Sequence, residues 1–283
     1  MAFRRMIRCM SLSMYAQAIV AAYHDHRPVA AACDAGPVDY NEAYAVQRTI
    51  WQLLAGSTRP TAWKVAAAAP GETPIAAPIL PQRLLESSTL KPATIPAHTL
   101  IRPGIEAEIA VRFGQDLPDR PAPYRQDEIR AAIAELCVAM EVVDTRLSDA
   151  HAAGANWRLA DHLLNGALVI GTPIPDWQTL RFDALPVRVQ ACGQILTDQI
   201  GLQPLNDLFH CLPWLVNHAG GICAGDVVTT GAWTGMHPVG GLGPLPFSCD
   251  IEFSGLGSAS VTFIQGSEAD SLQDPRDAKT NPV

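Results

Sequence analysis

The run IEAEIAVRF at residues 105–113 constrains the fold of this chain more than any other segment. Apolar residues alternate with Glu106 and Glu108, which predicts a β-strand whose side chains at positions i and i+2 point to the same face. Two carboxylates would then lie side by side in an otherwise apolar strand. Like charges this close raise each other's pKa unless a cation lies between them. The strand therefore predicts a β-sheet that carries a metal site with oxygen ligands.

Glu141 adds a third carboxylate in apolar surroundings, because it lies in the run AMEVV at residues 139–143. Three carboxylates form a hard ligand set, which suits Mg²⁺ or Mn²⁺ and is poor for Zn²⁺ or copper. Mg²⁺ keeps several waters, so the carboxylate and keto oxygens of a 2-oxo acid could take two of those positions. The alternative is that each glutamate is a solvated residue on the outer face of a half-exposed sheet.

Lys64 and Asp161 are the other candidate site residues. Lys64 lies in the run WKVAA, and a partly buried lysine needs a carboxylate or an anionic ligand. The alternative for Lys64 is an exposed loop position. Asp161 is predicted to be either a helix N-cap or an acid/base group, and His162 is interpreted as an ordinary structural or surface histidine.

The composition indicates a globular protein that acts on a small molecule. Of the 283 residues, 48% are hydrophobic and 17% charged, which suits one large domain or two small ones. The net charge of −8 argues against a nucleic-acid partner, since phosphate binding needs a basic face. Seven scattered cysteines without a C-x-x-C pair are typical of reduced thiols in a cytoplasmic protein. We expect neither a signal peptide nor a membrane span, because no apolar run is long enough.

The order of the patterns predicts an α+β fold of rolled, mixed β-sheets with a smaller helical N-terminal part and the metal site on an inner face. We expect a disordered or mis-started N-terminus, a helical or mixed subdomain, a metal-binding catalytic β domain and a disordered tail, at residues 1–13, 14–85, 86–265 and 266–283. Helices are expected at residues 14–24, 39–55, 126–136 and 204–218, and a polar connection at 149–160. Strands are expected at residues 104–113, 138–143, 164–170, 227–230, 249–254 and 258–264, with a hairpin at 186–200 and short strands and loops within 60–100.

Six segments follow one another along the chain: AYAVQ at residues 43–47, WKV at 63–65, RPGIEAEIA at 102–110, AMEVVDTR at 139–146, LAD at 159–161 through Gly166, and LN at 205–206 with AGDVVTTG at 224–231. In this order they resemble motifs of the 2-keto-4-pentenoate hydratases, which belong to the fumarylacetoacetate-hydrolase superfamily. RPGIEAEIA in particular resembles the P-x-I-E-A-E-I-A strand of that family. The resemblance covers about residues 14–265 and points to the hydratase and decarboxylase branch.

The resemblance implies one divalent cation, Mg²⁺ or Mn²⁺, bound by the three glutamates named above. It implies that Lys64 contacts the substrate or its carboxylate and that Asp161 takes part in a polar or proton-transfer network. Arg146 would pair with a neighbouring carboxylate or orient the substrate, and Thr230 would also belong to the substrate-binding residues. It further implies a homo-oligomer that could associate with a related decarboxylase or hydratase.

By this resemblance, the expected activity is the metal-dependent addition of water to 2-hydroxypenta-2,4-dienoate or a related 2-oxo-enoate in aromatic catabolism, with Asp161 as the acid/base group and Lys64 in support. Two segments depart from the family. VAAAA at residues 65–69 replaces the usual I-G-L-T-S, and IAAPIL at 75–80 lacks the usual Asp. Three alternatives therefore stay open: a decarboxylase of an oxalocrotonate-like acid, an acylpyruvate hydrolase, and a non-catalytic partner subunit.

Overall fold

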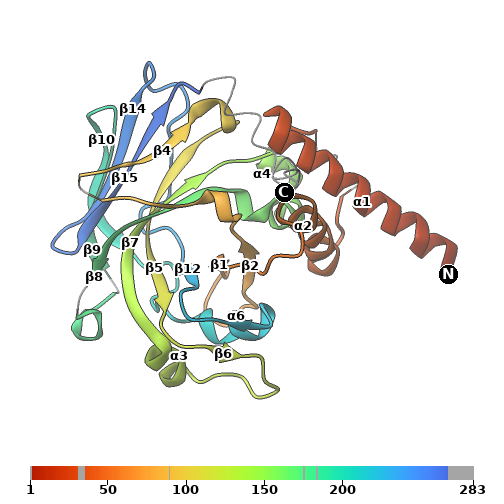
Figure 1. Ribbon diagram of the computed structural model, residues 1–283, viewed down its shortest axis with the longest axis horizontal. Coiled ribbons are helices and arrows are strands. Elements are labelled where there is room, and N and C mark those ends of the chain that lie inside the picture. The colour runs from red at the N-terminus through yellow and green to blue at the C-terminus, as the bar shows by residue number, and fades with distance from the viewer. Residues whose placement is uncertain (1, 31–35, 89, 175, 183, 267–283) are drawn as a thin grey trace, which may run out of the picture.

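The computed structural model describes residues 2–30, 36–88, 90–174, 176–182 and 184–266. Helices α1 (Ala2–Asp25) and α2 (Tyr40–Ala55) lie together on one side of the sheets (Figure 1). The Asp39 side chain accepts a hydrogen bond from Glu42 N and so caps the start of α2, which ends at Gly56. The helix expected over residues 39–55 is confirmed. The helix expected from residue 14 begins earlier, at Ala2. The tail expected at residues 266–283 lies outside the described residues except for Gly266.

The first β-sheet is mixed, as expected. Within the described residues it has eight strands in the order β2-β1-β12-β5-β7-β8-β3, with β13 paired to β5. The pairs β1–β12 and β3–β8 are parallel, and the other pairs are antiparallel. The strands are β1 (Ala62–Ala66), β2 (Ile75–Pro78), β3 (Leu84–Glu86), β5 (Gly104–Phe113), β7 (Ile133–Val143), β8 (Asn165–Ile174), β12 (Val227–Thr229) and β13 (Met236–Pro238). Residues 14–85 and 86–265 thus share one sheet.

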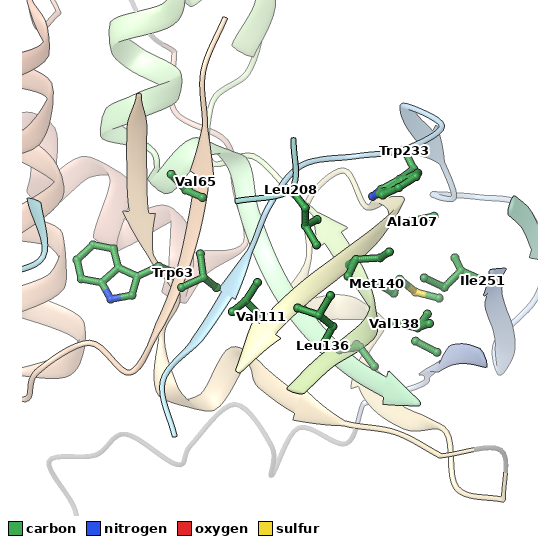
Figure 2. Close-up of a cluster of buried hydrophobic side chains, with 14 of the residues drawn as sticks. Trp63, Val65, Ala107, Val111, Leu136, Val138, Met140, Leu208, Trp233 and Ile251 are labelled. Atoms are coloured by element: carbon green, nitrogen blue, oxygen red, sulfur yellow. The ribbon is translucent and has the colours of Figure 1, made fainter. Parts of the chain in front are cut away.

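A second sheet packs against one face of the first. In the described part of the chain it has five strands in the order β10-β9-β14-β15-β4, namely β4 (Ala93–Pro96), β9 (Ala184–Ala191), β10 (Gln194–Leu202), β14 (Phe247–Phe253) and β15 (Gly257–Ile264). The core between the sheets includes Val138 and Met140 of β7 and Ile251 of β14 (Figure 2). The α+β fold of rolled mixed sheets is confirmed.

Shorter elements connect these strands. In the part of the chain that the structure describes, they are α3 (Gln126–Ala132), α4 (Ala150–Ala153), α5 (Ala155–Ala160) and α6 (Leu212–His218), four short 3₁₀ turns, and the small pair β6 (Leu117–Pro118) with β11 (Gly221–Ile222). Among the described residues, every helix is too short or too polar to span a bilayer.

Three expected elements differ from the structure. The helix expected over 126–136 ends at Ala132, because Ile133 and the residues after it pair with β5 as part of β7. The helix expected over 204–218 begins only at Leu212, since the Gln203 side chain accepts hydrogen bonds from two backbone amides of the preceding loop. The polar connection over 149–160 forms the two short helices α4 and α5.

Candidate metal centre

The pairing of β5 with β7 gathers the three predicted glutamates. Glu106 lies opposite Glu141 in the register, and Glu108 is two residues further along β5 on the same face. Each of them, here named the glutamate cluster, offers a carboxylate oxygen within 4.8 Å of the others. Glu108 and Glu141 are fully buried, and the Glu106 side chain is 16% exposed, so the cluster opens to solvent on one side. The opposite face of the two strands is apolar and faces the second sheet, through Ala107, Ile109, Val111, Val138, Met140 and Val142.

One oxygen of each buried carboxylate is fixed by the protein. Glu108 Oε2 accepts hydrogen bonds from Thr229 Oγ1 and, at 2.9 Å, from Gly231 N. Glu141 Oε1 accepts a hydrogen bond from Asn165 Nδ2 at 3.0 Å. Such contacts orient carboxylates for metal binding, and they do not involve the second oxygen of either carboxylate.

The other carboxylate oxygens of the cluster favour a bound cation. Glu108 Oε1 is buried, and no donor in the described part of the chain reaches it, although buried polar atoms almost always have a partner. Lys64 Nζ lies 2.6 Å from Glu141 Oε2 and 3.8 Å from Glu106 Oε2. Three carboxylates and one ammonium leave two negative charges, which one divalent cation would balance. The donors are all oxygens, so the residues fit Mg²⁺ or Mn²⁺.

Burial and mutual repulsion shift the ionisation of the cluster. Burial raises the pKa of Glu106 and of Glu141 to about 7 each, although the Lys64 ammonium lowers both. The pKa of Glu108 is also raised by burial. Burial alone would lower the pKa of Lys64, but the three carboxylates raise it above its usual value. Lys64 therefore stays an ammonium, and the carboxylates compete for protons when no metal balances them.

A left-handed turn borders the cluster. His162, Leu163 and Leu164 have φ values of 51°, 53° and 63°, which cost about 1–3 kcal/mol for each non-glycine residue. The Leu163 carbonyl accepts a long hydrogen bond of 3.4 Å from Lys64 Nζ. Asn165, which holds Glu141, follows the turn directly. Strained backbone of this kind often occurs at functional sites.

The structure does not bring Asp161 and Arg146 to the glutamate cluster. Asp161 is fully buried, and its Oδ1 forms an ion pair with Arg146 Nε at 2.6 Å. Thr145 Oγ1 and the Arg146 backbone amide donate to Asp161 Oδ2. No hydrogen bond or ion pair among the described residues joins this pair to the three glutamates. Asp161 does occupy the N-cap position of the 3₁₀ turn His162–Leu164, but its side chain makes no capping hydrogen bond to the described residues of that turn.

Thr230, predicted to bind substrate, turns away from the cluster. Its Oγ1 donates to the Ile109 carbonyl at 2.9 Å, and the adjacent Thr229 makes the contact with Glu108. Sequence reasoning missed Thr229 and Asn165. The signal for both was a polar residue at the edge of an apolar strand, but only the strand pairing shows which face each one takes.

The chain is similar to several known proteins. The family described as "Fumarylacetoacetate (FAA) hydrolase C-terminal" matches residues 62–267. A 2-keto-4-pentenoate hydratase of Burkholderia vietnamiensis is 28% identical over 181 residues, which are 60% of this chain and 64% of that protein. The match thus spans less than two thirds of the relative's length.

Two solved structures share the fold. One is 4-oxalocrotonate decarboxylase from Pseudomonas putida G7, complexed with magnesium and adipate, with a TM-score of 0.73 and 21% identity over 89% of this chain and 97% of that chain. The other is fumarylpyruvate hydrolase from Pseudomonas aeruginosa, in complex with Mn²⁺ and pyruvate, with a TM-score of 0.53 and 16% identity over 74% of this chain and 91% of that chain. The family match over most of the sequence, together with this fold, shows that the chain belongs to the fumarylacetoacetate hydrolase family.

Proposed function

We propose that this protein is a divalent-metal-dependent hydratase for 2-hydroxypenta-2,4-dienoate or a related 2-oxo-enoate. The observation that carries the proposal is the buried glutamate cluster, in which Glu108 has an oxygen without a partner among the described residues and Lys64 lies beside Glu141 and Glu106. The names of the curated relatives, 2-keto-4-pentenoate hydratase in each case, support the choice of reaction.

The three glutamates would hold one Mg²⁺ or Mn²⁺, and Thr229, Gly231 and Asn165 would keep two of them oriented. A divalent ion held there would act as a Lewis acid on the oxygens of a bound 2-oxo acid.

Lys64, as an ammonium, is the residue that we assign to proton donation and carboxylate binding. Its side chain is 13% exposed, and its amine lies beside Glu141 and Glu106. A positioned acid/base group contributes typically about 10²–10⁴-fold to a rate. Lys64 replaces Asp161 in this role, because the Asp161 carboxylate is engaged by Arg146.

Met236 supports a substrate with an apolar end. The pairing of β13 with β5 places Met236 directly opposite Glu106, so both side chains lie on one face. Met236 is 49% exposed and would give the substrate an apolar border beside Glu106. The unsaturated hydrocarbon end of a dienoate fits this border better than a second carboxylate does.

The direct test is turnover of 2-hydroxypenta-2,4-dienoate with Mg²⁺ or Mn²⁺, followed by loss of the dienol absorbance and identification of the hydrated product. The double variant Glu106→Ala with Glu108→Ala should lose the activity, and Glu135→Gln, at the other end of β7, should keep it. A folded double variant that hydrates the dienoate at the wild-type rate without metal would refute the proposal.

Decarboxylation of an oxalocrotonate-like acid is the second candidate. In the register of β1 with β2, Ala77 lies opposite Lys64, where a carboxylate could otherwise assist proton transfer. Loss of CO₂ from a 2-oxo acid needs no activated water, so a site with Lys64 alone in this role suits it. Comparing CO₂ release with hydration over a panel of 2-oxo acids separates the two reactions.

Oxalate binding without any turnover would favour a non-catalytic partner. Cytoplasmic location and a homo-oligomer stay predictions.

A further inference from the structure

We propose that Arg146 is a positioning residue for the metal centre. Its guanidinium holds the left-handed turn at His162–Leu164, and this turn sets the places of the Lys64 amine and the Glu141 carboxylate. The inference rests on the proposed function only in taking the glutamate cluster as the metal ligands.

Arg146 donates hydrogen bonds to the backbone at both ends of the turn. Nη2 donates to the carbonyl of Asp161, just before the turn, at 2.8 Å, and Nη1 donates to the carbonyl of Asn165, just after it, also at 2.8 Å. Nε forms the 2.6 Å ion pair with the Asp161 carboxylate. Arg146 is 2% exposed, and its guanidinium lies 4.4 Å from the centroid of the Tyr23 ring. A planar guanidinium can reach three acceptors at once, whereas a lysine ammonium cannot copy this fork.

The turn needs such support, because three successive non-glycine residues in the left-handed region are unfavourable without it. Backbone and side-chain bonds also hold it. His162 Nδ1 donates to the Pro78 carbonyl at 2.9 Å, the Asp144 amide donates to the Leu164 carbonyl at 2.8 Å, and the Leu164 amide donates to the Asp161 carbonyl at 2.9 Å. The guanidinium adds a side-chain link between the two carbonyls that flank the turn, those of Asp161 and Asn165.

The turn and the residue after it, Asn165, contact the candidate metal centre through two atoms. The Leu163 carbonyl accepts from Lys64 Nζ at 3.4 Å, and Asn165 Nδ2 donates to Glu141 Oε1 at 3.0 Å. Arg146 has no such contact with the cluster itself among the described residues. It therefore acts on the centre through the backbone that it holds.

Hydrogen exchange of the backbone amides of residues 161–166 tests the first half of the proposal. Arg146→Lys keeps the charge beside Asp161 but loses the fork. The matched control is Arg112→Lys, because Arg112 pairs with Glu135 and Glu86 at the far end of the same strands. We expect exchange at least about tenfold faster in Arg146→Lys and unchanged in Arg112→Lys. Equal exchange in wild type and Arg146→Lys would overturn the proposal.

Mn²⁺ affinity, measured by calorimetry, tests the second half. Loss of an outer partner of a metal ligand typically weakens binding by about 10–100-fold, and we expect this range for Arg146→Lys and for Asn165→Ala. The double variant should bind nearly as well as the weaker single variant, because both changes act through one contact. Fully additive losses, or an Arg146→Lys affinity within about twofold of wild type, would refute the link to Glu141. A wild-type protein that binds no Mn²⁺ would instead refute the proposed metal function, and the exchange experiment would still decide whether Arg146 holds the turn.

Discussion

Glu108 differs from its two neighbours in having one carboxylate oxygen that is buried without a partner among the described residues. Glu106 reaches solvent, and Glu141 Oε2 is paired with Lys64. Of the three proposed ligands, Glu108 is thus the one whose ionised form would gain most from a metal.

Glu108→Gln should therefore separate metal binding from folding. The glutamine oxygen can still accept from Thr229 and Gly231, so we expect a metal-free melting temperature at least equal to that of wild type. A ligand at 100 times its Kd stabilises a protein by about 2.7 kcal/mol, and the variant should lose this gain. Thermal melts with and without Mg²⁺ check both points. Glu135→Gln should keep the gain, and a full Mg²⁺ shift in Glu108→Gln would contradict the assigned ligand.

Lys64→Met should have opposite effects on binding and on turnover. The amine competes with a cation for Glu141, so its removal should tighten Mg²⁺ binding at least about tenfold. Turnover should fall by about 10²–10⁴-fold because the proposed proton-transfer group is lost. Calorimetry and steady-state kinetics measure the two effects, with the exposed Lys91→Met as control. Weaker Mg²⁺ binding in Lys64→Met would show that the amine supports the ion and does not compete with it.

The three glutamates could be predicted from the sequence because each interrupts an apolar strand within its own short segment. Thr229 and Asn165 could not, since their roles depend on strands paired across long stretches of sequence. Asp161 was predicted as an N-cap or acid/base group and Arg146 only from the family resemblance, because sequence alone does not tell a buried ion pair from a catalytic pair.

Among the elements, the turn at His162–Leu164 links pH to stability. Burial lowers the pKa of His162 to about 4 from its usual value near 6.5. Between these values the unfolded chain binds more protons than the folded chain, so the free energy of unfolding falls as the pH drops from 6.5 toward 4. The full loss from this group is about 3 kcal/mol.

His162→Asn should flatten that part of the pH profile. Asparagine tolerates the left-handed conformation and can still donate to the Pro78 carbonyl. Chemical denaturation at pH values from 4 to 7 gives the difference between wild type and variant, which removes the contribution of the glutamate cluster. The exposed His151→Asn should follow the wild-type profile, and an unchanged slope in His162→Asn would contradict the assignment.

Strand β8 lies close against the second sheet at Gly171. A Cβ there would lie 2.2 Å from Ser258 O and 2.6 Å from Ala259 Cβ. Gly171→Ala should therefore destabilise the fold by about 1–3 kcal/mol, as overpacking does. Urea denaturation measures the loss against Gly240→Ala, whose Cβ would lie 3.5 Å from its nearest neighbour in Pro103. A midpoint equal to that of wild type would show that β15 can move away at no cost.

Element boundaries show where local patterns are ambiguous. Ile129, Ala132, Ile133 and Leu136 fit a helical stripe, yet the chain changes from α3 to β7 between Ala132 and Ile133. The ladder with β5 decides the change, because it pairs the backbone of the whole segment and buries its apolar face. The pattern of apolar residues within one segment contains no information about the strand, here β5, that pairs with it.

For the whole molecule, the sequence predicted an α+β class and rolled mixed sheets, and both are confirmed. It did not predict that β1 would join β12 in parallel, with Lys64 beside Thr229. Pairing between such distant segments depends on how all the strands fit together, and no local motif encodes it. The centre is therefore complete only when the first sheet is complete.

The two faces of β5 restrict how the length of this strand can change in evolution. Deleting one residue from within Gly104–Phe113 would turn the carboxylates beyond the deletion into the apolar core and bring isoleucine and valine to the metal side. Lengths should therefore change by two residues at a time within the strand, or vary freely only in the segment between β5 and α3. Related chains that differ in size should have their insertions and deletions outside this strand.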